Sequence, residues 1–282
     1  MQIILNADDF GRSPHINAAV IQAHRQGVLT STSLMVMEDA VGEAVSLARE
    51  TPSLAVGLHT VMACGKALLP RCQIPHIVDR NGRFPDNAFW VGLNYLFSQT
   101  AREELTCELK AQFDRFIATG LPLSHVDSHV HMHVHPIVFD LLLSLAEQYG
   151  AQGFRLPRDD FRLAIGYSHH RAMTKAVWAL VFGCLNRRGV GRLRKSRLVF
   201  THRVFGLMQT GQMQEAYVVE MLHRLTLPSA EFYFHPSMIF EGETLGPNPG
   251  DLATLLSPAV KRVIEERGLR LATYPTLDRL ES

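Results

Sequence analysis

The feature that most constrains the fold is an alternation of short apolar runs with longer helix-like segments along the chain. Eight of the runs are predicted strands, at residues 2–6, 31–36, 54–58, 123–126, 153–156, 197–200, 231–234 and 269–272. Strands that alternate with helices favour a parallel sheet, either open or closed into a barrel. About eight strands favour the barrel, and we therefore predict an α/β protein with a (β/α) barrel.

Helix boundaries are also visible in the sequence. Ser13, followed by a proline, is expected to cap a helix that ends at Gly27. A second helix is predicted over residues 100–119, where a capping-box pattern runs from its first residue to Glu103. A third is predicted over residues 136–149. No repeat or linker interrupts the pattern, so we expect a single domain over residues 1–282.

Length, composition and cysteine spacing indicate one soluble domain in a reducing compartment. A chain of 282 residues with 46% hydrophobic content can bury a large core, and barrels of about 250 residues commonly form one domain. The four cysteines form no C-x-x-C pair, which argues against a structural zinc site or a disulfide scaffold. The first residues enter a strand directly, without a basic and apolar leader, so a cytoplasmic and unprocessed protein is expected.

Residues 161–214 form a basic excursion from an otherwise acidic chain. The segment has ten lysine or arginine residues and no acidic residue, whereas the net charge of the whole chain is +1. Its apolar run at 176–185 is too short for the roughly 20 residues of a transmembrane helix. The segment is either a buried helix followed by a solvated basic loop or a contact with an anionic membrane surface. It lacks interleaved aromatic residues, so nucleic-acid binding is not expected.

Polar side chains follow the predicted strands at the point where several of them end. They are Asp8 and Asp9, His59, Asp127 and His129, His202, and His235. Active sites of barrel folds lie at the carboxyl ends of the strands, so all of these side chains are expected on one rim.

The adjacent carboxylates Asp8 and Asp9 can take different roles. Neighbouring side chains at a strand end point apart, so one can bind a cation while the other stays free as a general base. The structural alternative is an Asx turn in which Gly11 supplies an unusual backbone angle. By itself, His59 fits a hydrogen-bonded core histidine better than a metal ligand.

Alternate residues from 127 to 135 carry groups that bind metals or protons. Asp127 and His129 face the same way on an extended chain, which suits two ligands or a ligand with its supporting partner. The proline after His135 is expected to start a helix, so His133 and His135 are predicted at the surface or at the helix cap. The role of His131 stays open.

A set of one carboxylate and two neutral imidazoles leaves positions open on a divalent metal for water and substrate. Zinc hydrolases and non-haem iron oxygenases both use such a set, and magnesium or manganese accepts it less readily. A spare carboxylate favours hydrolysis, because Asp8 can deprotonate a polarised water that attacks an amide or ester carbonyl. A carbohydrate- or lipid-binding protein without turnover is disfavoured, since it needs no such base.

Several motifs together resemble the YdjC-like carbohydrate deacetylases. They are Asn6-Ala7-Asp8-Asp9-Phe10-Gly11, Thr30-Ser31-Thr32-Ser33-Leu34-Met35, Val56-Gly57-Leu58-His59, His125-Val126-Asp127-Ser128-His129-x-His131-x-His133, Arg155-x-Pro157 and His235-Pro236. The resemblance implies a distorted TIM-like barrel and metal-dependent removal of an acetyl group from an N-acetylated sugar. It further implies that Asp9, His59 and His129 hold one divalent ion, zinc or magnesium. Asp8 is then the base.

Other residues receive supporting roles within this resemblance. His235 is the candidate acid that protonates the leaving amine, with a histidine packed at a strand end as the alternative. Arg155 orients Asp8, contacts the substrate or forms an ion pair elsewhere. Asp127 and His131 are expected to contact the substrate or to support the metal ligands.

The sequence resembles most the hopanoid-biosynthesis-associated branch of the family. That branch implies an N-acetylglucosaminyl group on a hopanoid lipid as the substrate, with a soluble chitooligosaccharide as the alternative. The basic and apolar excursion at 161–214 suits a lipid-linked substrate, either as an apolar lid at the barrel mouth or as a contact with the inner membrane face. The oligomeric state stays open, with a homodimer as one option.

Overall fold

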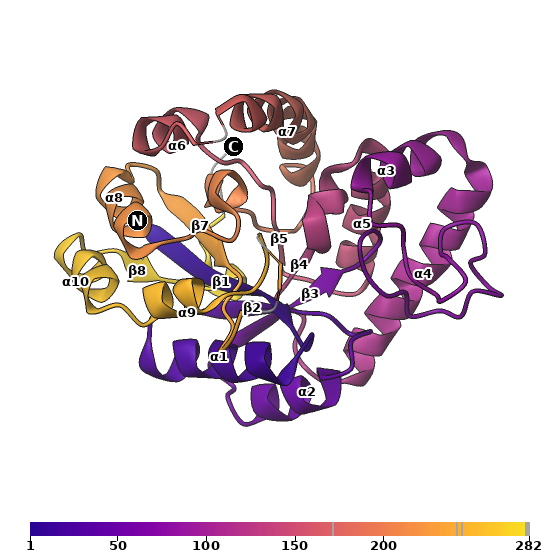
Figure 1. Cartoon of the computed structure of the whole chain (residues 1–282), viewed down its shortest axis with the longest axis horizontal. Helices are drawn as coiled ribbons and strands as arrows, with labels where there is room; N and C mark the ends of the chain where they lie inside the picture. The colour runs from indigo at the N-terminus through magenta and orange to yellow at the C-terminus, as the bar shows by residue number, and fades with distance from the viewer. Residues whose placement is uncertain (171, 241, 244, 280–282) are drawn as a thin grey trace.

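The structure is a computed structural model that describes residues 1–170, 172–240, 242–243 and 245–279. Its centre is one sheet with the strand order β5-β4-β3-β2-β1-β7-β6, in which β8 also pairs with β1. The strands are β1 (Gln2–Phe10), β2 (Ser31–Leu34), β3 (Ala55–Thr60), β4 (His125–Ser128), β5 (Gly153–Phe154), β6 (Arg203–Phe205), β7 (Ser229–Phe234) and β8 (Arg270–Leu271). Figure 1 shows this sheet at the centre of the molecule with the helices around it.

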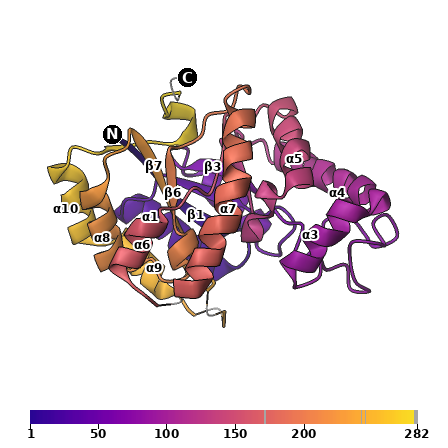
Figure 2. The ribbon, with the colours of Figure 1, turned by 90° about the horizontal axis from the view of Figure 1, so that it is seen from above.

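Helices connect the strands and cover the sheet. They are α1 (Pro14–Gln26), α2 (Val41–Arg49), α3 (Ala88–Phe97), α4 (Gln99–Ala118), α5 (Pro136–Gln148), α6 (Phe161–Tyr167), α7 (Ala172–Leu193), α8 (Glu215–Arg224), α9 (Pro249–Leu255) and α10 (Pro258–Glu266), with the 3-10 helices η1 (His129–Val134), η2 (Leu207–Gln209) and η3 (Tyr274–Thr276). In Figure 2, α7 stands between the group formed by α8, α9 and α10 and the group formed by α3, α4 and α5. No helix in the described part of the chain is long and apolar enough to cross a membrane.

The predicted α/β barrel is confirmed in a distorted, single-domain form. All pairings between the named strands are parallel, so the carboxyl ends of the strands gather at one edge. The barrel does not close, because β5 and β6 end the strand order and do not pair with each other. The sheet is therefore a curled half-barrel whose carboxyl edge carries the predicted site residues.

The strand predicted at residues 197–200 is reduced to a single bridge. Val199 pairs with Gly153, and its N–H and C=O bond to Gln152 and Phe154 at 2.9 Å each. The following strand begins only at Arg203 and pairs with β7 instead of β5. The chain thus leaves β5 after one bridge, which is why the barrel stays open at this point.

The predicted N-caps of α1 and α4 differ in outcome. Ser13 caps α1 as predicted, since its Oγ accepts a hydrogen bond from the N–H of Ile16 at 3.2 Å. The capping box expected for residues 100–103 is wrong. The helix α4 begins one residue earlier, and the hydroxyl of Ser98 accepts from Ala101 N–H at 3.2 Å. Ser98, with extended backbone angles, lies two residues before the threonine, and such a residue is a strong N-cap.

The strand β1 runs through the middle of the sheet and is buried along its whole length. Central strands of parallel sheets are covered on both faces, which accounts for its apolar first half. Asp8 and Asp9 belong to the carboxyl end of this same strand and are almost completely buried. Two adjacent buried carboxylates need positive or hydrogen-bonding partners, and these define the site.

Candidate functional site

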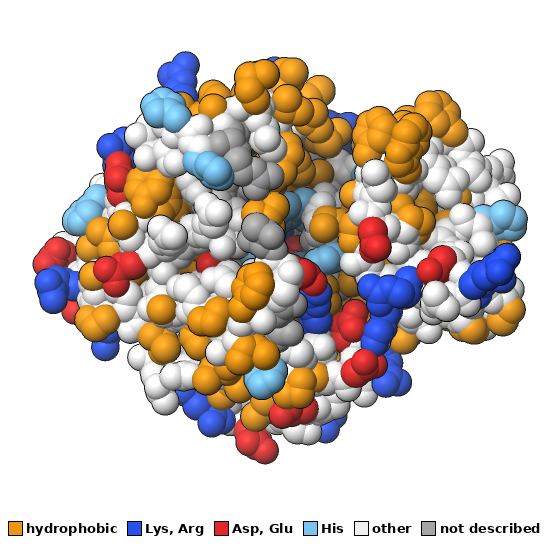
Figure 3. Space-filling model, viewed as in Figure 1, with side chains coloured by type: hydrophobic (Ala, Val, Ile, Leu, Met, Phe, Trp, Pro, Cys, Tyr) orange, Lys and Arg blue, Asp and Glu red, His pale blue; other side chains and the backbone are white. Residues whose placement is uncertain are grey.

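A cavity of about 790 Å³ opens at the carboxyl edge of the sheet. Side chains from the ends of four strands lie on its floor: Asp8, Asp9, His59, Ser128, His129, Tyr233 and His235. Its walls are mostly apolar side chains of α3, η1 and α7. In Figure 3 histidine side chains are visible in a central hollow between hydrophobic surfaces. The site thus combines a polar, titratable floor with apolar walls, as ligand pockets generally do.

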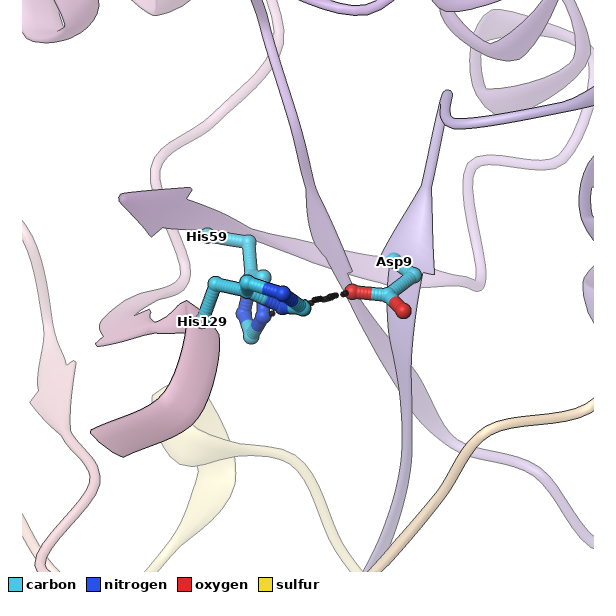
Figure 4. A group of neighbouring side chains, drawn as sticks. All are labelled: Asp9, His59 and His129. Carbon is cyan, nitrogen blue, oxygen red and sulfur yellow. Dashed lines mark ion pairs between the residues drawn. The ribbon is translucent and has the colours of Figure 1, made fainter. Parts of the chain in front are cut away.

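Asp9, His59 and His129 form a cluster of candidate metal ligands on this floor (Figure 4). The Oδ1 of Asp9 lies 3.6 Å from His59 Nε2 and 3.4 Å from His129 Nδ1. Two ligand atoms that each lie about 2.1 Å from one zinc ion are roughly 3.0–3.5 Å apart, so these separations are close to those of a metal site. The same Oδ1 is buried and has no hydrogen-bond partner, which indicates that it needs a cation.

A second group of potential ligands, Asp8, His59 and Asp127, is equally compact. Both of its carboxylates are already bound by Arg155, with oxygen-to-nitrogen distances of 2.7 and 2.8 Å. The Nδ1 of His59 is also occupied, because it bonds to Asp127. Asp9 therefore fits a metal better than Asp8 or Asp127.

Asp127 orients His59 toward Asp9. Its Oδ1 bonds to His59 Nδ1 at 2.8 Å, which leaves Nε2 on the side of Asp9. Carboxylates commonly fix metal-binding histidines in this way. Burial lowers the pKa of His59, but the charge and hydrogen bond of Asp127 outweigh it and raise the pKa to about 9. The metal-free imidazole is therefore cationic at neutral pH, and a metal ion must displace its proton.

The carboxylate of Asp9 is ionised in this environment. Burial opposes the charge, yet His129 and Arg12 hold the pKa of Asp9 well below its usual range. The Nη1 of Arg12 donates to Asp9 Oδ2 at 3.1 Å. One carboxylate oxygen is thus bound by arginine while the other faces the two imidazoles.

Arg155 holds Asp8 in a bidentate ion pair. Its Nη1 donates to Oδ2 at 2.7 Å and its Nη2 to Oδ1 at 2.8 Å, while Asn6 Nδ2 donates to Oδ1 at 2.9 Å. An ionised carboxylate has about four lone-pair sites, so one remains on Oδ2. Asp8 lines the cavity, whereas Arg155 is fully buried and does not. Arg155 is therefore in contact with Asp8 and not with the cavity.

Glu231 completes the surroundings of Arg155 and was missed in the sequence. Arg155 Nε donates to Glu231 Oε1 at 2.9 Å, and Nη1 lies 2.8 Å from Asp127 Oδ2. The hydroxyl of Tyr274 donates to Glu231 Oε2 at 2.5 Å. One guanidinium therefore binds three buried carboxylates. The signal in the sequence was a single charged residue within the otherwise uncharged strand β7.

Residues 2–266 match the family model described as YdjC-like protein. The chain belongs to this family. It is 33% identical to a carbohydrate deacetylase of Brevibacillus brevis over 98% of this chain and 100% of that one. It is 29% identical to a chitooligosaccharide deacetylase of Serratia marcescens over 98% of both chains.

The fold of this YdjC-like protein also resembles that of a solved structure. An Enterococcus faecalis V583 protein named for cellobiose-phosphate cleavage superposes with a TM-score of 0.73. The two chains are 25% identical, and the match covers 97% of each. The curled half-barrel is thus the architecture of a related chain over nearly its full length.

Backbone strain in the YdjC-like protein is concentrated at the cavity. In the described part of the chain, four non-glycine residues have positive φ angles, and all four line the cavity: Asp9 (65°), Cys64 (56°), Val130 (50°) and His131 (55°). Such angles cost of order 1–3 kcal/mol each and persist where the surrounding structure imposes them. For the β-branched Val130 this conformation is especially unfavourable. Their common location supports a functional role for the cavity.

His131 and His235 lie at the cavity in different environments. The Nε2 of His131 lies 2.9 Å from the hydroxyl of Tyr233 and forms a hydrogen bond with it. Burial lowers the pKa of His131, so its ring is neutral. The backbone N–H of His235 donates to Asp251 at 2.8 Å, but its Nδ1 has no hydrogen-bond partner. The backbone of His235 is thus fixed, and the buried Nδ1 of its ring lacks a partner within the protein.

Two other histidines lie elsewhere than predicted. His133 is fully buried and bonds through Nδ1 to Ser128 Oγ at 2.7 Å, so the surface position expected for it is wrong. His202 bonds through Nδ1 to Ser229 Oγ at 2.8 Å. Because Ser229 is the first residue of β7, His202 lies at the amino edge of the sheet and not on the predicted rim. His135 is the N-cap residue of α5, as expected.

The excursion at 161–214 also differs from its buried-helix interpretation. It contains α6, α7, η2 and the short strand β6. The helix α7 extends through the basic residues up to Leu193, and many of its apolar side chains are exposed, for example Met173 and Leu180. Four others, Trp178, Val181, Phe182 and Leu185, line the cavity. The apolar run is therefore one wall of the cavity.

Proposed function

We propose that this YdjC-like protein hydrolyses the acetamide of an N-acetylated carbohydrate and releases acetate. The observation that carries the proposal is the pairing of Asp8, a carboxylate oriented by arginine, with the adjacent cluster of Asp9 and two histidines. The names of the relatives from Brevibacillus brevis and Serratia marcescens, a carbohydrate deacetylase and a chitooligosaccharide deacetylase, support the same reaction.

Asp9, His59 and His129 would hold one divalent metal ion. Two imidazole nitrogens favour zinc over magnesium, which prefers an all-oxygen environment. When bound, the ion polarises the acetamide carbonyl and makes a water molecule more acidic. Asp127 supports the site by keeping the lone pair of His59 on Nε2.

The residues of the chain would handle two proton transfers. Asp8 accepts a proton from the water whose oxygen forms the new bond to the acetyl carbon. His235 donates a proton to the sugar nitrogen as the carbon–nitrogen bond breaks, so the products are acetate and an amine. Arg155 keeps Asp8 in place through two short hydrogen bonds. The unpartnered Nδ1 of His235 agrees with the acid role.

The deacetylase proposal is favoured over the two other predicted classes. A non-haem iron oxygenase has no use for a base next to its carboxylate ligand, and Asp8 is held in that position by a fully buried arginine. A binding protein without turnover would gain nothing from the cost of burying three carboxylates around one guanidinium.

The apolar wall of the cavity supports a lipid-linked substrate, such as an N-acetylglucosaminyl group on a hopanoid. Trp178, Val181, Phe182 and Leu185 of α7 face the cavity together with Phe89 of α3. Sugar hydroxyls gain little from such a surface, whereas a fused-ring hydrocarbon buries its apolar area there. In this role α7 is the apolar lid expected from the sequence, and contact with the inner membrane face belongs to the same proposal.

Acetate release from two substrates tests the proposed function. With zinc-loaded protein, we expect acetate from an N-acetylglucosaminyl hopanoid and, with a lower kcat/KM, from a short chitooligosaccharide. Protein stripped of metal with a chelator is the control and should release none. Acetate release from the soluble sugar alone would support deacetylation and contradict the lipid-linked substrate. No acetate from either substrate would contradict deacetylation.

Replacing Asp127 by asparagine is expected to weaken zinc binding by about 10–100-fold, the usual effect of losing a partner of a metal-binding histidine. The amide retains the shape of the carboxylate but not the charge that fixes His59. Isothermal titration with zinc measures the change. Asp39→Asn, at an exposed carboxylate on the surface, is the matched control. Equal affinity in the two variants would remove His59 from the ligand set.

A further inference from the structure

Exposed hydrophobic side chains of the molecule gather in three segments. Of the fifteen large hydrophobic residues that are exposed in the described part of the chain, eleven lie in α3, α7 and residues 238–240. The most exposed are Phe89, Trp90 and Phe97 of α3, Met173 and Leu180 of α7, and Phe240, with exposed fractions from 60% to 80%. We call these exposed side chains of α3, α7 and 238–240 the apolar rim.

The apolar rim surrounds the mouth of the cavity. Phe89 and Val181 are exposed and also line the cavity, so the apolar wall continues onto the outer surface. The third segment follows His235 and precedes Leu245, which both line the cavity. Figure 3 shows the hydrophobic masses on either side of the central hollow. Exposed hydrophobic residues that cluster around one opening commonly mark a binding surface.

The charge of α7 fits an anionic lipid surface. The exposed face of this helix is apolar in its first half and carries Arg187 and Arg192 in its second. Arg187 and, just after the helix, Arg194 and Lys195 are exposed and take part in none of the ion pairs of the described residues. Exposed apolar side chains next to basic residues without ion-pair partners suit contact with an anionic membrane surface.

We propose that the apolar rim docks on an anionic lipid bilayer with the cavity mouth facing the membrane. Three separate projections around an opening fit a soft, fluid surface better than a rigid protein partner. A lipid-linked acetamide could then enter the cavity along apolar side chains without passing through water. This inference rests on the proposed function, because it gives the deacetylase site a membrane as its source of substrate.

The fluorescence of the two tryptophans of the chain reports directly on binding to a lipid bilayer. Trp90 lies in α3 and is exposed, and Trp178 lies in α7 at the cavity. We expect full-length, zinc-loaded protein to sediment with vesicles of phosphatidylcholine and phosphatidylglycerol. Tryptophan emission should then shift to shorter wavelength and be quenched by brominated lipids. In a Trp178→Phe variant the same change should persist through Trp90 alone.

Surface variants distinguish docking through the apolar rim from nonspecific adsorption to vesicles. The double variant Phe97→Ser with Leu180→Ser should lower the vesicle partition coefficient at least tenfold. Ile117→Ser is the matched control, since Ile117 is 45% exposed near the end of α4, which leads to the amino edge of the sheet. It should bind vesicles like the wild type. Arg194→Glu with Lys195→Glu should reduce binding to anionic vesicles and not to pure phosphatidylcholine.

Other outcomes would overturn the proposal. Vesicle binding that is equal in the rim variant and the wild type would exclude the rim as the docking surface. If the wild type does not bind vesicles and the rim variant converts a dimer to a monomer, the rim joins two copies of the chain. Acetate release from a soluble chitooligosaccharide is measured in parallel and should be unchanged in the rim variant. If the wild type releases no acetate, the proposed function is contradicted. If the wild type releases acetate but does not bind vesicles, only the docking proposal is contradicted.

Discussion

Replacing Asp8 by asparagine is expected to lower kcat for acetate release by about 10²–10⁴-fold, the usual contribution of a general base. The amide has nearly the same shape, and its oxygen can still accept from Arg155, but it cannot take a proton from water. KM and zinc content should change little, because the candidate ligands belong to Asp9 and two histidines. Steady-state kinetics with metal analysis of the same sample measures all three quantities.

The control for this variant is Asp140→Asn. Asp140 lies on α5, is partly exposed and pairs with Arg188 and Arg192, away from the cavity lining. Its kcat should stay within twofold of the wild type. Because the asparagine at position 8 turns an N–H group toward Arg155, melting temperature is recorded to correct for unfolded protein. A kcat close to that of the wild type for Asp8→Asn would assign the base to another residue.

The positions of the site residues along the chain could be predicted from local patterns. A strand followed at once by a carboxylate or a histidine places that side chain at the carboxyl edge of a parallel sheet, and this rule located Asp8, Asp9, His59 and His129. The same rule failed for His202. Its preceding segment forms one bridge instead of a strand, so the histidine lies before β6 and not after it.

The partner of Arg155 across the barrel could not be predicted from the sequence. Arg155 follows β5, whereas Glu231 lies in β7, and the strand order places these strands at opposite parts of the sheet. They meet because the sheet curls, so that Arg155 Nε reaches Glu231 at 2.9 Å. Alternation along a strand gives the face on which a side chain lies but not the curvature of the sheet. Glu231 therefore appeared only as an isolated charge in β7.

The exposure of α7 could not be predicted from sequence patterns either. A helix that is apolar all round is normally interpreted as buried. Here one face, with Trp178 and Phe182, covers the cavity while the opposite face, with Met173 and Leu180, meets solvent. The pattern is the same for a helix between two protein layers and for a helix with a cavity on one side and solvent on the other. Only the position of α7 at the open side of the half-barrel distinguishes them.

Replacing Arg155 by methionine is expected to lower the free energy of unfolding by about 3–5 kcal/mol at pH 7, because it leaves buried charges without their partner. Asp8, Asp127 and Glu231 all lose their shared cation, and each is essentially inaccessible to water. Methionine fills much of the volume, so the loss is mainly electrostatic. Urea unfolding of metal-free protein measures it. The control, Arg188→Met, removes an exposed ion pair with Asp140 and should cost less than about 1 kcal/mol.

The pH dependence of the free energy of unfolding tests whether the stability lost in Arg155→Met is electrostatic. In the wild type, burial opposes the charge of Asp127, but Arg155 and His59 hold its pKa far below the usual value. That stabilisation is present above the unfolded-state pKa of about 3.9 and is lost as pH falls toward the lower folded-state pKa. In Arg155→Met the pKa values of Asp127 and Glu231 in the folded protein rise, because the charge that lowers them is lost. The variant should therefore become more stable as pH falls from 7 to about 5, relative to the wild type. A constant difference between the two proteins over this range, or a loss no larger than that of Arg188→Met, would mean that the charge of Arg155 does not hold the three carboxylates in place.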